Sequence, residues 1–102
     1  MSNVIHANTQ EFKDLVSNNE VVFVDIFAKW CGPCKMLAPI VEQFADKHPE
    51  VKVVKIDVDQ EQSLAMEYQV QSIPTLITLK NGQPVARQLG FMPLEALEDM
   101  IK

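Results

Sequence analysis

The chain has 102 residues, 47% of them apolar and 23% charged, which is typical of one globular domain covering residues 1–102. Its formal net charge is −5 and no basic stripe alternates with aromatic residues, so nucleic-acid binding is disfavoured. No apolar run approaches the roughly 18 residues that a membrane span needs. Residues 1–8 lack the basic and apolar regions of a secretory signal, so we expect a cytoplasmic protein without a membrane partner.

The first part of the chain predicts a helix followed by a strand. Asn8 or Thr9 can cap a helix that ends near Asn18, because apolar residues recur between them at helical spacing. The run Val21–Phe27 is β-branched and aromatic almost throughout, as in a strand covered on both faces. One residue in this run, Asp25, does not suit such a setting.

The next part predicts a second helix, strand and helix. Apolar positions over residues 34–47 lie on one helical face, and the helix is expected to begin near Cys31. Pro39 inside it removes one amide donor, which predicts a kink rather than a break. Residues 51–58 then predict a strand, and residues 61–68 predict a shorter helix.

The last part predicts an antiparallel hairpin and a closing helix. Asn81-Gly82 separates β-prone runs at residues 75–79 and 85–89, and Asn-Gly is the strongest short-range hairpin signal. Pro93 suits the first turn of a helix that ends the chain. We therefore expect an α/β domain with a mixed sheet and helices on both of its faces.

Two cysteines lie at the junction between the first strand and the second helix, in Trp30-Cys31-Gly32-Pro33-Cys34. One helical turn separates them, so a disulfide can close and reopen with little backbone movement. The helix N-terminus favours a thiolate over a thiol, which predicts a solvent-facing, nucleophilic Cys31. Cys34, one turn further in, is expected to be more buried and to act as the resolving thiol.

A zinc site and a pair of inert core thiols are the alternatives to redox chemistry. A structural zinc ion needs four ligands, and only His6 and His48 could complete the set. These histidines are far apart in the sequence and lack the usual ligand spacing. We therefore expect neither a bound metal nor a metal-binding role.

The cysteine motif resembles that of the thioredoxin family, and the resemblance covers nearly the whole chain. It includes further matching positions, which are Asp25, Pro39, Lys55, Ile73-Pro74-Thr75, Lys80-Asn81-Gly82 and Gly90. The resemblance implies the thioredoxin fold, a mixed sheet of about five strands flanked by about four helices. The chain departs from the family pattern at Phe27, Gln69 and Phe91, where a second tryptophan, a glycine and a small residue are usual.

Asp25 and Lys55 are expected to serve the cysteine pair. Burial among apolar residues disfavours a charged carboxylate and so raises the pKa of Asp25. The resemblance implies that Asp25 is the general base for Cys34, whereas a salt-bridged structural role is the alternative. In a parallel pairing of the two strands, the amine of Lys55 could lie near Asp25 and moderate its pKa; otherwise Lys55 is a solvated lysine.

The resemblance also implies a binding surface for an extended peptide. An X-Pro bond is cis in only about 5 to 6% of cases in folded proteins, but thioredoxins hold this proline cis, so we predict a cis Ile73-Pro74 bond. The backbone of Ile73 would then be free to pair with a substrate. The other residues of this surface are expected to be Trp30, Gly32, Pro33, Gly90 and Phe91.

The function implied is that of a monomeric thiol-disulfide oxidoreductase that reduces disulfides in cytoplasmic proteins. Cys31 attacks the substrate disulfide and Cys34 resolves the mixed disulfide. The resemblance further implies no bound cofactor and re-reduction by an NADPH-dependent thioredoxin reductase. An oxidase or isomerase of the same fold, and a docking module that makes no use of its thiols, are the rival functions.

Overall fold

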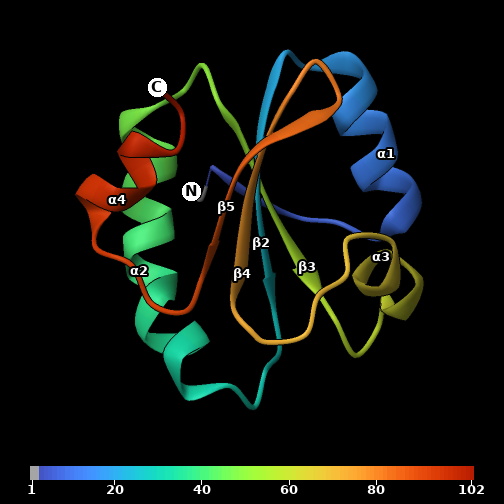
Figure 1. The fold of residues 1–102 in the computed structure, drawn as a ribbon. Helices are drawn as coiled ribbons and strands as arrows, with labels where there is room; N and C mark the ends of the chain where they lie inside the picture. Colours follow the sequence, from blue (N-terminus) through green and yellow to red (C-terminus); the bar gives the residue numbers. More distant parts are fainter. Residues whose placement is uncertain (1–2) are drawn as a thin grey trace.

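The computed structural model describes residues 3–102, which form a mixed five-stranded sheet between two layers of helices (Figure 1). Figure 1 shows α1 and α3 on one side of the sheet and α2 and α4 on the other. Within residues 3–102, no helix has the length and apolar character needed to cross a membrane. The elements in chain order are β1 (Val4–His6), α1 (Thr9–Asn18), β2 (Val21–Phe27), α2 (Gly32–Lys47), β3 (Lys52–Asp57), α3 (Gln62–Glu67), β4 (Thr75–Lys80), β5 (Gln83–Leu89) and α4 (Leu94–Asp99).

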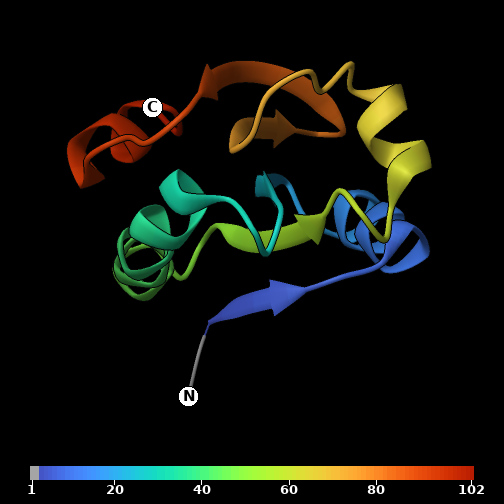
Figure 2. The same cartoon turned by 90° about the horizontal axis from the view of Figure 1, so that it is seen from below.

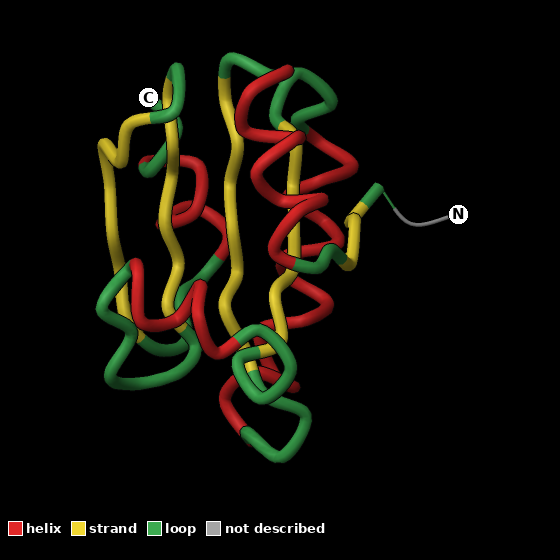
Figure 3. Tube along the Cα trace, turned by 90° about the vertical axis from the view of Figure 1, so that its right-hand side faces the viewer, coloured by secondary structure: helices red, strands yellow, loops and turns green. Residues whose placement is uncertain are grey.

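The strands lie in the order β1-β3-β2-β4-β5, which Figure 2 shows from one end of the sheet. Strands β1, β3 and β2 are parallel, whereas β4 and β5 run antiparallel to their neighbours. The most apolar strand, β2, is therefore central, and β1 and β5 form the two edges (Figure 3). The predicted α/β class, mixed sheet and helices on both faces are confirmed.

Most predicted elements are confirmed within a residue or two of their ends. Helix α1 begins after Asn8, whose side chain accepts from the Glu11 amide while the Glu11 carboxylate accepts from the Asn8 amide. Strand β1 was missed, because three residues are too few to show an alternating pattern. It is a strand because it pairs in parallel with its neighbour β3.

The β4–β5 hairpin turns at the Asn-Gly pair, as predicted. Asn81 has φ 52° and Gly82 has φ 82°, so both central residues are in the left-handed region that a two-residue turn of this kind requires. Glycine adopts that region without the steric cost that a Cβ atom imposes. The turn starts the pairing of β4 with β5, and a one-residue register shift between Thr78 and Leu79 sets the pairing of the remaining residues up to Leu89, which Gly90 follows.

Side chains of β2 alternate between two cores, one on each face of the sheet. Val22, Val24 and Ile26 pack toward α1 and α3. Phe23 faces the opposite way, and its ring lies 4.8 Å from that of Phe44 on α2. Asp25 has the same parity as Phe23, so the alternation of the strand places this carboxyl on the face covered by α2.

Candidate active site

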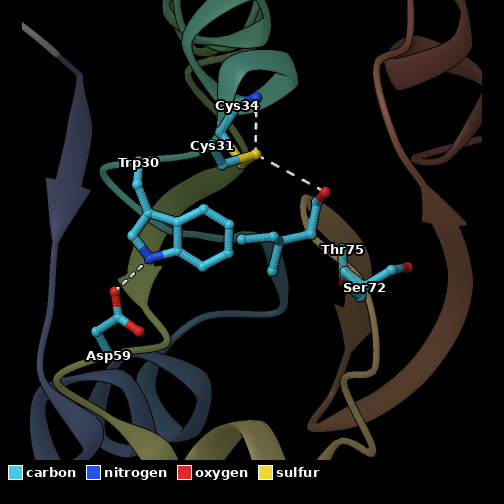
Figure 4. The surroundings of a disulfide bond; sticks show 7 residues. Trp30, Cys31, Cys34, Asp59, Ser72 and Thr75 are labelled. Carbon is cyan, nitrogen blue, oxygen red and sulfur yellow. Dashed lines mark hydrogen bonds between the residues drawn. A yellow bond between two sulfur atoms is a disulfide. The ribbon is translucent and has the colours of Figure 1, made fainter.

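The two cysteines occupy the first turn of α2 and are joined by a disulfide (Figure 4). Cys31 is the N-cap residue, Gly32 begins the helix, and the Cα atoms of Cys31 and Cys34 lie 5.2 Å apart. The amide of Cys34 donates to the sulfur of Cys31 across 3.2 Å. This sulfur therefore occupies the position where a helix N-cap normally places an oxygen, and the helix end favours negative charge on it.

Both cysteines are buried, and Cys31 is more enclosed than expected. Cys34 is 2% exposed and Cys31 is 5% exposed, so Cys34 is the more buried, as predicted. The expectation of a solvent-facing Cys31 is wrong for the oxidised protein. Ala28 and Ile73, which belong to the loops on either side, pack against the pair.

The loop before β4 meets the cysteine pair. The Ile73-Pro74 bond is cis, which confirms the prediction. The carbonyl oxygen of Ile73 lies 3.8 Å from the sulfur of Cys31 (Figure 4). The Thr75 hydroxyl donates to the Ser72 carbonyl across 2.6 Å, and the Gly90 amide donates to the Pro74 carbonyl across 2.9 Å.

Trp30 precedes the pair and forms a hydrogen bond with Asp59, a residue whose role is not evident from the sequence. Its side chain is 69% exposed, yet its indole Nε1 donates to Asp59 Oδ2 across 2.8 Å (Figure 4). Asp59 follows β3, and its amide donates to the Asp57 carboxylate across 2.9 Å. The Asp-x-Asp spacing after a buried strand is a signal for such a turn, but nothing along the chain links it to Trp30.

Asp25 is fully buried within β2. No other described residue forms a hydrogen bond with either carboxylate oxygen. Burial raises the pKa of Asp25 from 3.8 to about 6, and the positive charge of Lys55 partly opposes that rise. The carboxyl therefore changes its charge state close to neutral pH, where it is able to accept or donate a proton.

Lys55 lies beside Asp25 in the parallel pairing of β2 with β3, as expected. Its amine sits over the ring of Phe27, 4.5 Å from the ring centroid. A hollow of about 100 Å³ opens beside both Lys55 and Cys34, and Lys29 and Lys35 also line it. The hollow connects the inner sulfur to a positively charged rim.

The remaining residues predicted for the binding surface come from the start of α2 and from the segment after β5. Gly32 and Pro33 are exposed at the start of α2, while Gly90 has φ 85° and its amide donates to the Pro74 carbonyl. Phe91 is 43% exposed immediately after Gly90. The arrangement thus combines a disulfide at a helix end with a backbone segment beside it.

The two histidines interact with different parts of the molecule. The rings of His6 and Phe27 have centroids 6.2 Å apart, and His48 follows the far end of α2, where it binds Glu98. Across residues 3–102, no three His, Cys, Asp or Glu side chains are arranged to hold a metal ion.

Comparison with known proteins gives a consistent result. The family model described as Thioredoxin matches residues 3–102. A thioredoxin of Haemophilus influenzae is 43% identical, covering 99% of this chain and 96% of the relative. A thioredoxin of Bacillus subtilis is 44% identical, covering 96% and 94%. Among solved structures, a mutant thioredoxin from Halobacterium salinarum superposes with a TM-score of 0.91 at 40% identity, over 96% of this chain and 87% of that one.

Proposed function

Because this chain belongs to the thioredoxin family and is a thiol-disulfide oxidoreductase, we propose that it reduces disulfides in cytoplasmic proteins through Cys31 and Cys34. The observation that carries the proposal is the sulfur of Cys31 at the N-cap of α2, where it accepts the Cys34 amide at 3.2 Å. The partial positive charge at the helix N-terminus favours the thiolate, which is the form that attacks a disulfide.

In the first step, the Cys31 thiolate attacks one sulfur of a substrate disulfide. The bond between the two substrate sulfurs breaks, and the second of these sulfurs leaves as a thiolate that takes up a proton. A mixed disulfide then joins Cys31 to the substrate. Cys31 is the more exposed of the pair and lies between the exposed Trp30 and Pro33, which supports its role as the attacking residue.

In the second step, Cys34 attacks the mixed disulfide and restores the Cys31–Cys34 bond. The substrate leaves as a second thiol, so two electrons have passed from the cysteine pair to the substrate. Asp25 acts as the base that takes the proton of Cys34, and its pKa of about 6 suits that role. The hollow of about 100 Å³ beside Cys34 and Lys55 has room for a water molecule next to the resolving cysteine.

The substrate is held as an extended segment beside the cis-proline loop. The carbonyl of Ile73, 3.8 Å from the Cys31 sulfur, can pair with the backbone of that segment. The exposed Trp30 and Phe91 supply apolar contacts, and the buried Pro74 holds the Ile73 backbone beside the pair. Gly32, Pro33 and Gly90 allow close approach of the two backbones. The bulky Phe91 ring is the part of this surface expected to restrict which partners bind.

Electrons return to the pair from NADPH by way of a thioredoxin reductase. The protein itself carries no bound cofactor in this proposal, because the reversible Cys31–Cys34 disulfide holds the two electrons. It acts as a monomer, with residues 1–102 forming a single domain. Its partners are therefore the reductase and proteins that contain disulfides.

The test is NADPH-coupled reduction of insulin by the wild type and by Cys31→Ser and Cys34→Ser, with a purified thioredoxin reductase. Both variants are expected to lose turnover, because each step needs one of the sulfurs. Cys34→Ser is expected to accumulate a mixed disulfide with insulin, visible on a non-reducing gel, whereas Cys31→Ser forms none.

Met66→Ala provides the control, because Met66 is an exposed apolar residue on α3 outside the site. It is expected to turn over insulin like the wild type. Retained turnover in Cys31→Ser would refute the proposal, as would faster oxidation of dithiol peptides than reduction of disulfides by the wild type.

A further inference from the structure

Helix α3 ends in a turn whose geometry suits glycine, although the residue there is Gln69. The Gln69 amide donates to the Met66 carbonyl across 3.1 Å, and the Val70 amide donates to the Ala65 carbonyl across 2.8 Å. This pair of bonds defines a Schellman helix end, whose central residue adopts the left-handed conformation. Gln69 has φ 53°, so its Cβ atom makes the turn costlier than glycine would.

The chain's single arginine, Arg87, binds this turn from strand β5. Its Nη1 donates to the Tyr68 carbonyl across 2.6 Å, and its Nη2 donates to the Gln69 carbonyl across 3.0 Å. The two bonds use the planar fork of the guanidinium, which a lysine lacks. The ring of Tyr68 packs edge-on against the buried Phe12, with centroids 6.0 Å apart. Arg87 therefore joins residues 68–69, which are anchored in the core by this ring, to the β4–β5 hairpin.

The same turn begins the loop that carries the cis proline. At the far end of that loop, the Gly90 amide just beyond β5 donates to the Pro74 carbonyl across 2.9 Å. Both ends of residues 69–74 are therefore bound to β5 or to the residue that follows it. Between them lies Ile73, whose carbonyl is 3.8 Å from the Cys31 sulfur.

We propose that Arg87 is a positioning residue that offsets the strained Gln69 turn and thereby holds the Ile73 backbone in place for protein substrates. The inference rests on the proposed function, since it concerns how that substrate is bound. Arg87 touches neither the substrate nor the sulfurs, and it acts through the Tyr68 and Gln69 carbonyls. Substrates that need backbone pairing depend on it, whereas small disulfides do not.

The test compares second-order rate constants for reduced wild type, Arg87→Ala, Gln69→Gly and the double variant. The disulfides are insulin and the small reagent dithiobis(nitrobenzoate), and the fluorescence of the single tryptophan, Trp30, follows the insulin reaction. Loss of the two bonds is expected to slow insulin reduction by about threefold to tenfold, with the small reagent unaffected. In the Gln69→Gly background, Arg87→Ala is expected to reduce the insulin rate constant less, because glycine adopts the left-handed conformation of the turn without the two Arg87 hydrogen bonds.

Three further measurements guard against a general folding defect. Gln88→Ala, an exposed neighbour on β5, is expected to match the wild type with both disulfides. Arg87→Lys keeps the charge and the aliphatic stem but not the fork, so its insulin rate is expected to lie between those of wild type and Arg87→Ala. Exchange of the Val70 amide is expected to speed up in Arg87→Ala and not in Gln88→Ala.

The proposal would be overturned if Arg87→Ala slowed the reduction of insulin and of the small reagent equally. It would also be overturned if Arg87→Ala had the same effect on the insulin rate constant whether residue 69 is Gln or Gly. If Arg87→Ala does not fold, the Arg87→Lys rates and the Val70 exchange decide it in the same way. Failure of the proposed function is distinguishable, because the wild type itself would then not reduce insulin. Exchange of the Val70 amide would still show whether Arg87 stabilises the turn.

Discussion

Among residues 3–102, Asp25 is the one charged residue that is fully buried. Asp25 lies in the central strand with no described hydrogen-bond partner, and Lys55, its neighbour in the register, places its amine over Phe27 instead of on the carboxylate. The cost of burying the charge is therefore only partly offset. A residue that weakens the fold in this way is expected where proton transfer is needed.

We expect Asp25→Asn to change the pH dependence of stability in the oxidised protein. Because the folded pKa of Asp25 lies above its unfolded value, the wild type loses stability as pH rises from 3.8 to about 6 and does not regain it above that. Each pKa unit corresponds to about 1.4 kcal/mol, so the variant gains about 3 kcal/mol relative to the wild type over this range. Urea unfolding across pH measures the difference.

The same variant is expected to resolve the mixed disulfide more slowly, because an amide cannot take the Cys34 proton. Quenched-flow gels report that step directly. Asp46→Asn, which changes an exposed carboxyl on α2, is the control and is expected to leave both the stability profile and the rate unchanged. Parallel stability curves for wild type and Asp25→Asn would show that this carboxyl does not bear the raised pKa.

At the scale of elements, the β4–β5 hairpin determines the positions of the residues that bind the loop before β4. Its two-residue turn begins the pairing of the strands, and a one-residue register shift between Thr78 and Leu79 then brings Arg87 opposite Ile77. Beyond the end of β5, the Gly90 amide donates to the Pro74 carbonyl. The strand–helix junction is equally local, since Cys31 caps α2 with its own sulfur. Both features follow from residues adjacent in the chain.

Gly82→Ala is expected to destabilise the protein by about 1 to 2 kcal/mol, the cost of a left-handed conformation for a residue with a Cβ atom. The new methyl group would lie 3.8 Å from Val16 Cγ1, an ordinary contact, so the backbone is the source of the loss. Urea unfolding measures it. Gly32→Ala is the matched control, because its φ lies outside the left-handed region and its methyl meets nothing within 4 Å; an equal loss in both variants would contradict the explanation.

At the scale of the whole molecule, a polar cluster joins the C-terminal end of α2 to α4. His48 Nε2 donates to Glu98 across 2.8 Å, and the Lys47 amine lies 3.4 Å from the same carboxylate. His48 also lies 3.3 Å from Glu50. Together with the buried Leu97, this cluster holds the last helix on the face of the sheet that contains Asp25.

We expect Glu98→Gln to lower stability near neutral pH, with the difference disappearing in acid. The hydrogen bond from His48 and the charge of Lys47 hold the pKa of Glu98 below its ordinary value. A lowered folded pKa stabilises the protein above the unfolded pKa, and that contribution is lost as pH falls through the folded value. Urea unfolding of wild type, Glu98→Gln and the exposed control Glu95→Gln tests this, and a pH-independent difference would contradict it.

The sequence by itself determined the features that depend on neighbours along the chain. The apolar periods predicted four helices and four of the five strands, Asn81-Gly82 predicted the turn, and the position of Cys31 before a helix predicted its chemistry. The cis Ile73-Pro74 bond was predicted only from the family resemblance, because a proline in isolation favours trans.

Only the tertiary structure decided which distant residues meet. It made Val4–His6 a strand, placed Asp59 under Trp30, enclosed Cys31 more than expected and brought Arg87 to Gln69. The physical reason is common to all four. Local periodicity sets which face of an element is apolar, but the order of strands in the sheet and the packing of loops at its edge set which faces come together.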